Sequence, residues 1–309
     1  MSVLSRPYFH NETAAFEYLE SVIWADGAVC PHCGALDRLT KVTANPAKRI
    51  RAGLWRCGHC KGQFTVKVGT VFEHMRIPLN KALQATYLMT SSKKGISAHQ
   101  LHRVLEITYK TAWFLAHRIR EAMRTGALAP FGGEGGVVEI DETFIGRKAG
   151  MEKRNAYHHK MAVLSLVHRE SGAVRSFVVD RATMGNMMPI VLANVDRETY
   201  VMTDESKAYP KSLRKIFLGH GRVNHGAGEY GRGPVYTNTI EGYFSIFKRG
   251  MKGVYQHCAE KHLHRYLAEF DFRYMNRAAN GFDDGQRSVA ALRGIVGKRL
   301  TYARPDIIA

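Results

Sequence analysis

The chain has 309 residues, enough for about two domains, and its 45% hydrophobic and 23% charged residues exclude a mostly disordered protein. No run of about 18 apolar residues is present, which excludes a membrane-spanning helix, and acidic residues near the N-terminus disfavour a signal peptide. The formal net charge is +18, with an excess of 10 positive charges in residues 1–130 and 8 in residues 131–309. We therefore expect an intracellular protein whose partner is nucleic acid, with a membrane surface or an acidic protein as the alternatives.

Four of the five cysteines form two pairs near the N-terminus. Two residues separate Cys30 from Cys33, 23 residues follow, and Cys57 and Cys60 repeat the spacing. Because this spacing lets one tight turn aim two sulfurs at a single ion, the pattern predicts a tetrahedral zinc site flanked by short strands. Four thiolates leave no open coordination position, so one Zn²⁺ with a structural role is expected. Two disulfides or two redox-active pairs are the alternatives; the expected intracellular location disfavours the first, and the lack of a surrounding βαβ pattern disfavours the second.

Helical periodicity begins at Leu79 and predicts a helical segment over residues 79–130. Ser97 and Thr108 are suitable N-caps for two short helices joined by a turn at 106–108. Such a pair matches helix-turn-helix geometry, whose second helix enters the major groove of DNA; a helical hairpin that only packs is the alternative. The residues expected to face outward are Tyr109, Lys110, Trp113, His117, Arg118 and Arg120, of which Lys110, Arg118 and Arg120 are candidate DNA contacts. A glycine-rich linker over 125–136 marks the best domain boundary.

After the linker the pattern changes to strands. It predicts strands over 137–142, 160–167, 173–179 and 199–204, and helices over 184–195, 238–248 and 261–277. The stretch 220–234 is rich in glycine and basic residues and is expected to be a loop, either facing DNA or at the plain surface. This order of elements is RNase H-like: three antiparallel strands, a helix, a further strand and then helices. We therefore expect a multidomain α+β/α/β chain whose second half holds a mixed five-stranded sheet flanked by helices.

Acidic residues are placed at the ends of two of these strands and on a later helix. Asp141 and Asp204 are expected side by side at adjacent strand ends, and Glu241 is expected to reach in from its helix. Carboxylates this close repel one another unless cations neutralise them, and hard oxygen ligands suit Mg²⁺ or Mn²⁺. Two such ions about 3.5–4 Å apart can support phosphodiester transfer. The alternative is that the acids are solvated or cap helices, as Asp204 would for residues 205–207.

These motifs resemble those of the DDE-type insertion-sequence transposases with an N-terminal zinc ribbon, in the ISXO-like branch. The resemblance covers nearly the whole chain and rests on the paired cysteines, VEIDET at 138–143, TD at 203–204, TNTIEG at 237–242 and shorter matches from 247 to 277. The two aspartates are separated by 62 residues, and the 36 residues between Asp204 and Glu241 fall within the family's usual spacing.

The resemblance implies roles for individual residues. The catalytic residues would be Asp141, Asp204, Glu241 and Lys248, with the three acids binding two Mg²⁺ or Mn²⁺ ions and Lys248 and Arg249 contacting DNA. Some relatives in this branch have Asn as the third ligand, and Asn238 lies one helical turn before Glu241. A carboxylate binds Mg²⁺ more strongly than a neutral amide, so Glu241 is preferred and Asn238 is an alternative or outer ligand.

The resemblance also implies an organisation and an activity. A zinc ribbon domain (1–78) and a helix-turn-helix-like DNA-binding segment with linker (79–130) would bind terminal inverted repeats of double-stranded DNA. An RNase H-like DDE catalytic domain (131–309) would cut the DNA and join it to a target, in an oligomer of at least two chains. The expected setting is the bacterial cytoplasm, at the nucleoid, without a membrane partner. The rival functions are a domesticated, non-catalytic DNA-binding relative and an RNase H-like nuclease that cuts without joining.

Overall fold

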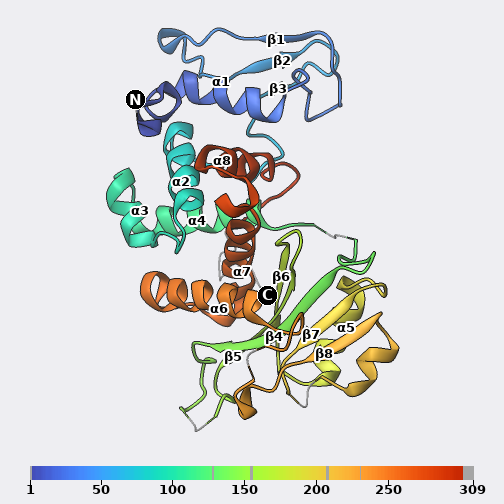
Figure 1. The fold of residues 1–309 in the computed structure, drawn as a ribbon. Helices are drawn as coiled ribbons and strands as arrows, with labels where there is room; N and C mark the ends of the chain where they lie inside the picture. The colour runs from blue at the N-terminus through green and yellow to red at the C-terminus, as the bar shows by residue number, and fades with distance from the viewer. Residues whose placement is uncertain (1, 127–128, 154–155, 207–208, 230, 302–309) are drawn as a thin grey trace, which may run out of the picture. The chain divides into compact units, whose positions relative to one another are not determined.

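The computed structural model describes residues 2–126, 129–153, 156–206, 209–229 and 231–301, which form two compact units (Figure 1). The first unit combines Met1–Ser92, Ile96–Arg124 and Asp283–Ala309, and the second combines Lys93–Gly95 and Thr125–Phe282. The predicted linker begins the second unit, and its residues 127–128 lie outside the described residues. None of the helices in the described ranges has the length and hydropathy that a membrane span requires.

The N-terminal part of the first unit is a small antiparallel sheet with one longer helix. The sheet order is β1-β2-β3, with β1 (Leu39–Lys41), β2 (Trp55–Cys57) and β3 (Gln63–Phe64), and the helix is α1 (Glu12–Ile23). Short 3₁₀ turns cover Val3–Ser5, Pro7–Phe9 and Pro46–Lys48. Cys30, Cys57 and Phe64 form the buried centre. The carboxylate of Glu20 accepts a hydrogen bond from the Trp55 indole at 2.9 Å, which ties α1 to the sheet.

Four further helices complete the first unit. They are α2 (Leu79–Ser91), α3 (Ala98–Leu105), α4 (Tyr109–Met123) and α8 (Asp284–Arg293). As predicted, the hydroxyls of Ser97 and Thr108 cap α3 and α4, and residues 106–108 join the two helices. Helix α8 buries Ala291 and Leu292 and packs on α2, so the chain from Asp283 onward belongs with the N-terminal helices and not with the sheet that precedes it.

The second unit is built on a mixed five-stranded sheet, as predicted. The order is β6-β5-β4-β7-β8, with β4 (Val137–Ile145), β5 (Met161–His168), β6 (Val174–Val179), β7 (Tyr200–Thr203) and β8 (Gly219–Arg222). Strands β4, β5 and β6 pair antiparallel, whereas β7 lies parallel to both β4 and β8. Strand β5, between β6 and β4, is almost wholly buried, because both faces of the sheet are covered.

Helices cover the two faces of this sheet. On one face lies α5 (Met184–Asn194); on the other lie α6 (Asn238–Gly250), a π-helical turn (Met251–Tyr255) and α7 (Glu260–Met275) (Figure 1). The remaining 3₁₀ turns are Lys211–Lys215, His225–Ala227 and Ala278–Asn280. Alternation along β5 serves both layers: Val163 packs toward α6 and α7, and Leu164 packs toward α5. The same alternation places the odd-numbered residues of β4, Glu139 and Asp141 among them, on the α6 face.

Two sequence predictions for this sheet were wrong in detail. Asp141 does not end its strand, because β4 continues to Ile145 through antiparallel pairing with β5. The predicted loop at 220–234 begins inside a strand, because Gly219–Arg222 forms β8 at the sheet edge. This strand has two glycines and two basic residues and no apolar side chain, so periodicity could not reveal it.

Candidate functional site

The four paired cysteines form a compact sulfur cluster in the first unit. Their Sγ atoms all lie within 4.8 Å of one another, and the pairs Cys30–Cys60 and Cys33–Cys57 are each 3.7 Å apart. Sulfurs about 2.3 Å from a tetrahedral zinc ion are about 3.8 Å from one another, so the donor set fits one Zn²⁺. The residue after each second cysteine has a left-handed backbone, φ 75° at Gly34 and 60° at its counterpart Lys61. The two knuckles are therefore matching turns.

The two histidines inside the knuckles have other partners. His59 Nε2 lies 2.8 Å from Asp37 Oδ1, and His32 Nε2 lies 3.4 Å from the carbonyl of Gln63. The prediction that four sulfurs and no histidine close the site agrees with this arrangement. Cys258, in the second unit, is far along the chain from the cluster and is not part of it.

Asp141 and Asp204 lie beside each other in the second unit. Strand β7 pairs in parallel with β4 up to Met202 opposite Glu139, and continuing this register by two residues places Asp204 opposite Asp141. Asp204 follows the end of β7, and its Oδ1 accepts a hydrogen bond from the Ser206 amide at 2.9 Å. The alternative prediction was that Asp204 caps a helix over 205–207. Asp204 accepts a hydrogen bond from the Ser206 amide in a turn, and residue 207 lies outside the described residues.

The electrostatics of Asp141 reflect this crowding. Burial, followed by the charges of Asp204 and Glu142 and then of Glu241, raises the pKa of Asp141 well above its ordinary value. Burial also raises the pKa of Asp204, and the neighbouring charge of Glu205 adds to that shift. Negative charges that destabilise one another in this way are stabilised by a cation.

Glu241 lies in the first turn of α6 and does not line the cavity described below, but its charge adds to the raised pKa of Asp141. Its side chain is 44% exposed, and its Oε1 accepts a hydrogen bond from the Thr237 hydroxyl at 3.3 Å and lies 3.2 Å from Nε2 of His225. The loop that carries His225 is fastened next to Asp204, because the Glu205 carboxylate accepts hydrogen bonds from the amides of His225 and Gly226. Asn238, the first residue of α6, is exposed.

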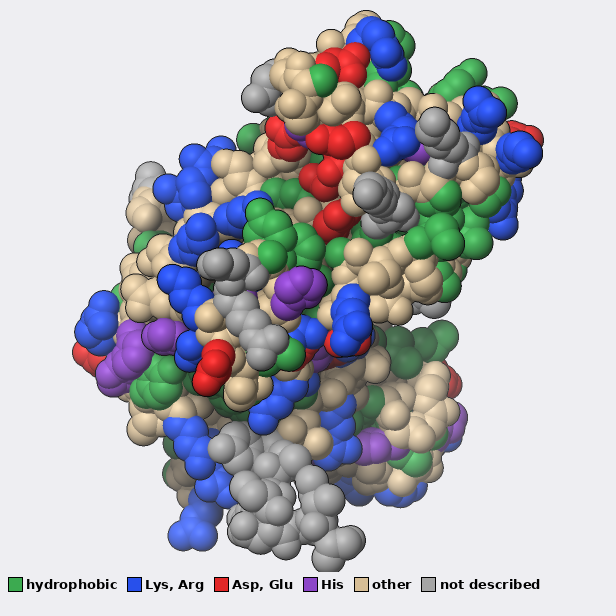
Figure 2. Space-filling model, turned by 90° about the horizontal axis from the view of Figure 1, so that it is seen from below, with side chains coloured by type: hydrophobic (Ala, Val, Ile, Leu, Met, Phe, Trp, Pro, Cys, Tyr) green, Lys and Arg blue, Asp and Glu red, His purple; other side chains and the backbone are tan. Residues whose placement is uncertain are grey.

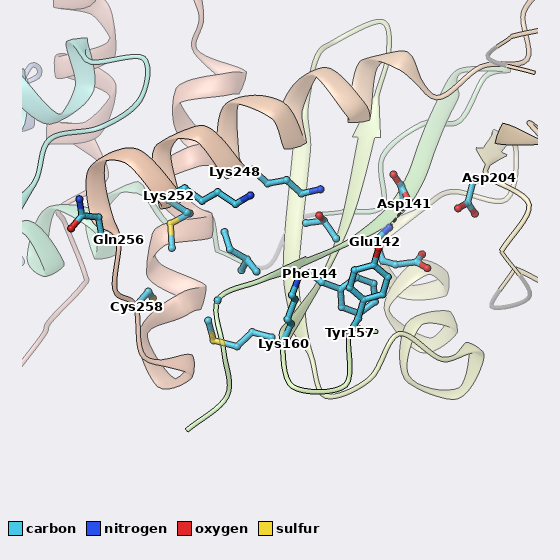
Figure 3. A pocket seen from close by; sticks show the side chains of 15 residues that line it. Asp141, Glu142, Phe144, Tyr157, Lys160, Asp204, Lys248, Lys252, Gln256 and Cys258 are labelled. Atoms are coloured by element: carbon cyan, nitrogen blue, oxygen red, sulfur yellow. Dashed lines mark hydrogen bonds between the residues drawn. The ribbon is translucent and has the colours of Figure 1, made fainter. Parts of the chain in front are cut away.

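A cavity of about 640 Å³ opens beside the aspartates (Figure 3). Asp141, Glu142 and Asp204 line one end, and the side chains of Lys160, Lys248 and Lys252 line the rest together with Phe144 and Tyr157. Figure 3 shows the ammonium groups of Lys248 and Lys252 directed along the cavity toward its acidic end. Burial lowers the pKa of Lys248, and the charge of Asp141 opposes that shift. The cavity therefore offers carboxylates at one end and cations along the approach.

Sequence reasoning missed three of the residues that shape this cavity. Glu142 lies at its acidic end, where its Oε2 accepts a hydrogen bond from the buried Tyr209 hydroxyl at 2.5 Å. Burial raises the pKa of Glu142. Lys160, the residue before β5, and Lys252, in the π-helical turn, line the same cavity. An acid directly after Asp141 was a visible signal, but only the fold shows that it stays at the same cavity.

The predicted DNA contacts differ in their surroundings. Lys110 is exposed near the start of α4, and Arg249 is exposed on α6 with its Nε donating to the carbonyl of Ser245. Arg118 is half-buried and donates to the backbone carbonyls of Val71 and Glu73 at 2.7 and 2.8 Å. Arg120 is only 2% exposed, so the prediction that it faces outward was wrong. The apolar face of α4 is broader than periodicity indicated, because α2 and α8 also pack on this helix.

The excess of positive charge is visible at the surface. Figure 2 shows Lys and Arg side chains spread over the face in view, with Asp and Glu side chains in smaller groups between them. This distribution agrees with the sequence, in which both halves of the chain carry a positive excess.

Comparisons with known proteins place these features in context. Residues 134–275 match the model of the ISXO2-like transposase domain, and residues 10–63 match that of a transposase zinc-ribbon domain. A protein of Halobacterium salinarum described as an uncharacterized protein in transposable element ISH50 is 28% identical over 289 residues, covering 86% of this chain and 91% of that protein. A chain of a simian T-cell lymphotropic virus intasome bound to PP2A regulatory subunit B56 gamma is 15% identical with a TM-score of 0.29; the match covers 62% of this chain and 65% of the viral complex's chain.

Proposed function

The chain belongs to the ISXO2-like transposases that carry an N-terminal zinc ribbon, and we propose that it binds the ends of a DNA element and catalyses metal-dependent DNA cleavage and strand transfer. One observation carries the proposal: Asp141 and Asp204, with 62 residues between them in sequence, lie together at a cavity whose approach is lined by lysines. Acidic side chains that serve only to keep a surface hydrated would be exposed to water, and would not lie half-buried beside one another.

We propose that Asp141, Asp204 and Glu241 hold two Mg²⁺ or Mn²⁺ ions. The donor set fits hard cations because it consists of carboxylate oxygens, and because positive charge opposes the burial and the mutual repulsion that together raise the pKa of Asp141. When bound, such ions lower the pKa of the attacking hydroxyl or water and stabilise the leaving oxygen of a phosphodiester. Asn238 remains the alternative third ligand.

The chain's own side chains would position the DNA. Lys248 would donate to a phosphate oxygen next to the acidic end of the cavity, with Lys252 and Lys160 holding the strand along its approach. Arg249, exposed on α6 outside the cavity lining, would contact DNA further along the strand. In the first step, a water oxygen would form a bond to phosphorus while the bond from phosphorus to a 3′-oxygen breaks, which leaves a 5′-phosphate and a free 3′-hydroxyl. In the second step, that hydroxyl would lose its proton and form a bond to phosphorus in the target strand, while the 3′-oxygen of the target leaves and takes up a proton. No covalent bond to the protein is needed, and none of the roles requires a Ser or Tyr nucleophile.

The proposed fold class of the second unit is RNase H-like. The strand order β6-β5-β4-β7-β8, with three antiparallel strands followed by two parallel ones, supports this assignment. The first acid lies on the central strand β4 and the second directly after its parallel neighbour β7. This arrangement uses sheet pairing, and not proximity in sequence, to join the two aspartates.

End recognition is proposed for the first unit, through the zinc ribbon and α3–α4 used as a helix-turn-helix. The exposed side chains at the start of α4, Tyr109 and Lys110, support contact with the major groove. Arg118 and Arg120 are proposed instead to hold the unit together. The zinc ion would be structural, and two element ends imply at least two chains in the complex with double-stranded DNA.

The proposal is tested with full-length protein, Mg²⁺, DNA taken from the sequence flanking the gene, and a supercoiled target. Joined products support transposition, cleavage alone supports a nuclease, and binding without either supports a non-catalytic relative. The variant Asp141→Asn is expected to lower cleavage by about 10²–10³-fold, since a charged group acting at the reaction centre is lost. Asp180→Asn is the matched control, because Asp180 is an exposed acid of the same unit, 78% accessible, and should leave cleavage unchanged.

A further inference from the structure

Glu139 is a buried carboxylate to which the proposed reaction assigns no role. It lies on β4 two residues before Asp141, so both side chains project from the α6 face of the sheet. Glu139 is 0% exposed, and apolar side chains such as Ile145 pack on the same face of the sheet. A buried charge without partners is strongly unfavourable, so the surroundings of Glu139 should reveal what keeps it there.

One oxygen of Glu139 caps helix α6. Its Oε2 accepts a hydrogen bond of 2.9 Å from the backbone amide of Ile240, the third residue of the helix. Amides of the first helical turn have no partner within the helix and favour negative charge. The residue at the N-cap position, Thr237, makes no capping bond with its side chain and donates to Glu241 instead. The cap of α6 therefore comes from the strand that carries Asp141.

The other oxygen of Glu139 holds an arginine that fastens the chain entering α6. Oε1 accepts a hydrogen bond of 2.6 Å from Nε of Arg169, the residue after β5. The two terminal nitrogens of that guanidinium donate to the carbonyls of Pro234 and Tyr236 at 2.8 and 2.5 Å. The group also stacks over the Tyr236 ring, 3.5 Å from its centroid. One guanidinium thus joins Glu139 to the segment that leads to Glu241.

We propose that Glu139 and Arg169 are positioning residues that set the start of α6 against β4 and thereby set Glu241 against Asp141. The inference rests on the proposed function for the role of those two acids. An ion pair of this kind adds little stability compared with apolar side chains of the same volume, but its directional bonds define one geometry. Glu241 follows Ile240 directly, so an error at this cap moves the third acid itself.

The test compares two buried acids that each pair with an arginine in the second unit. Glu139→Gln keeps the shape of the side chain but presents an oxygen to only one of its two N–H donors. Glu269→Gln is the matched control: Glu269 is 0% exposed and accepts bonds of 2.5 Å from Arg273 Nη1 and from the Tyr255 hydroxyl, on α7 and the π-helical turn. Both variants remove one buried negative charge, but only the first touches the start of α6.

Three quantities are measured on the full chain: Mn²⁺ affinity by electron paramagnetic resonance, hydrogen exchange of the amides at 239–242, and the melting temperature. We expect Glu139→Gln to weaken Mn²⁺ binding by about 10-fold to 100-fold, as for other residues that orient metal ligands, and to speed exchange at Ile240 and Glu241. Glu269→Gln should lower the melting temperature without either effect. Should Glu139→Gln fail to fold, Arg169→Lys carries the same test, because a lysine keeps the charge and loses the donors to Pro234 and Tyr236.

The proposal is overturned if Glu139→Gln, or Arg169→Lys in its place, matches the control in Mn²⁺ affinity and in exchange at 239–242, since the pair would then serve stability alone. Failure of the proposed function gives a different result: the wild-type chain would neither bind Mn²⁺ nor cleave DNA. In that case the exchange comparison still decides whether Glu139 sets the start of α6.

Discussion

The cysteine cluster and the acids at the cavity are the two groups of side chains proposed here to bind metal ions, but the chain assembles them differently. The four cysteines come from two short turns that lie 23 residues apart, and their sulfurs are within 4.8 Å of one another. The acids come from a strand, the residue after a second strand, and a helix, over 101 positions from Asp141 to Glu241. Among the residues that the structure describes, only the cysteines reach that mutual distance as a group.

The difference teaches where each site obtains its geometry. A knuckle turn aims its two sulfurs by local backbone conformation, as the matching left-handed residues Gly34 and Lys61 show. The acids depend on strand register, on the cap of α6 and on the loop of His225, each of which is a tertiary feature. We therefore expect changes at the zinc centre to act on folding, and changes at the cavity to act on chemistry.

Breaking the zinc centre should have the largest effect. Cys57→Ser is expected to unfold the ribbon and abolish binding to element ends, because binding of structural zinc contributes about 10–16 kcal/mol to folding in small zinc modules. Zinc content by mass spectrometry and hydrogen exchange over β1–β3 check this outcome. Cys258→Ser is the control and should keep one zinc ion per chain. A Cys57→Ser protein with full zinc content and an ordered ribbon would contradict the assignment of that ligand.

Removing the third acid should leave folding intact and reduce chemistry. Glu241→Gln is expected to lower strand transfer by about 10²–10³-fold, since the amide loses the negative charge that binds a cation. Asn238→Ala, one helical turn earlier and also exposed, should keep most of the activity. Rates of strand transfer and circular dichroism of both variants decide the matter. Full activity in Glu241→Gln together with a large loss in Asn238→Ala would reverse the assignment.

A buried aspartate on α7, outside the cavity, should give the stability of the second unit a pH dependence. Asp271 accepts hydrogen bonds from the Tyr243 hydroxyl and from the amide and hydroxyl of Ser176, and its complete burial raises its pKa to about 6. The folded carboxyl thus binds its proton more tightly than the unfolded one. Its favourable contribution is complete below about pH 4, the unfolded pKa, and is lost as the pH rises through about 6; the raised pKa of Asp141 acts in the same direction.

The expected loss from Asp271 is about 3 kcal/mol between pH 4 and pH 7, at 1.36 kcal/mol for each pKa unit. Urea-dependent hydrogen exchange of β5 and β6 in metal-free protein measures it within the second unit. Asp271→Asn is expected to be less stable at low pH but to show a flatter profile. A variant whose profile stays parallel to that of the wild type would assign the pH dependence to other groups.

The smallest effects are expected in α4, where two cations are predicted to differ. Lys110→Ala should weaken binding to element ends and reduce the slope of log affinity against log salt by about one, with stability unchanged. Arg118→Ala should lower stability by about 1–3 kcal/mol, because the carbonyls of Val71 and Glu73 lose a charged donor. Filter binding at several salt concentrations and thermal unfolding separate the two. Equal salt slopes for Lys110→Ala and wild type would remove Lys110 from the interface.

Much of this molecule follows from short-range patterns. The cysteine spacing predicted the sulfur cluster, and the hydroxyl caps Ser97 and Thr108 predicted the starts of α3 and α4. Runs of β-branched residues predicted four of the five strands of the large sheet. Strand β8 was not predicted, because its few residues have no apolar alternation. Its backbone forms a strand by pairing with β7.

Contacts between residues that are distant in sequence were decided only by the tertiary structure. The sequence by itself determined the zinc ligands, the identity of the acids and the basic excess, because spacing, composition and caps act over a few residues. Packing determined that Arg120 is buried, that α8 joins the N-terminal helices, and that Glu139 and Arg169 hold the start of α6. A side chain's burial and its hydrogen-bond partner depend on which elements meet, and in this chain those elements are brought together by sheet pairing and by helix docking across many tens of residues.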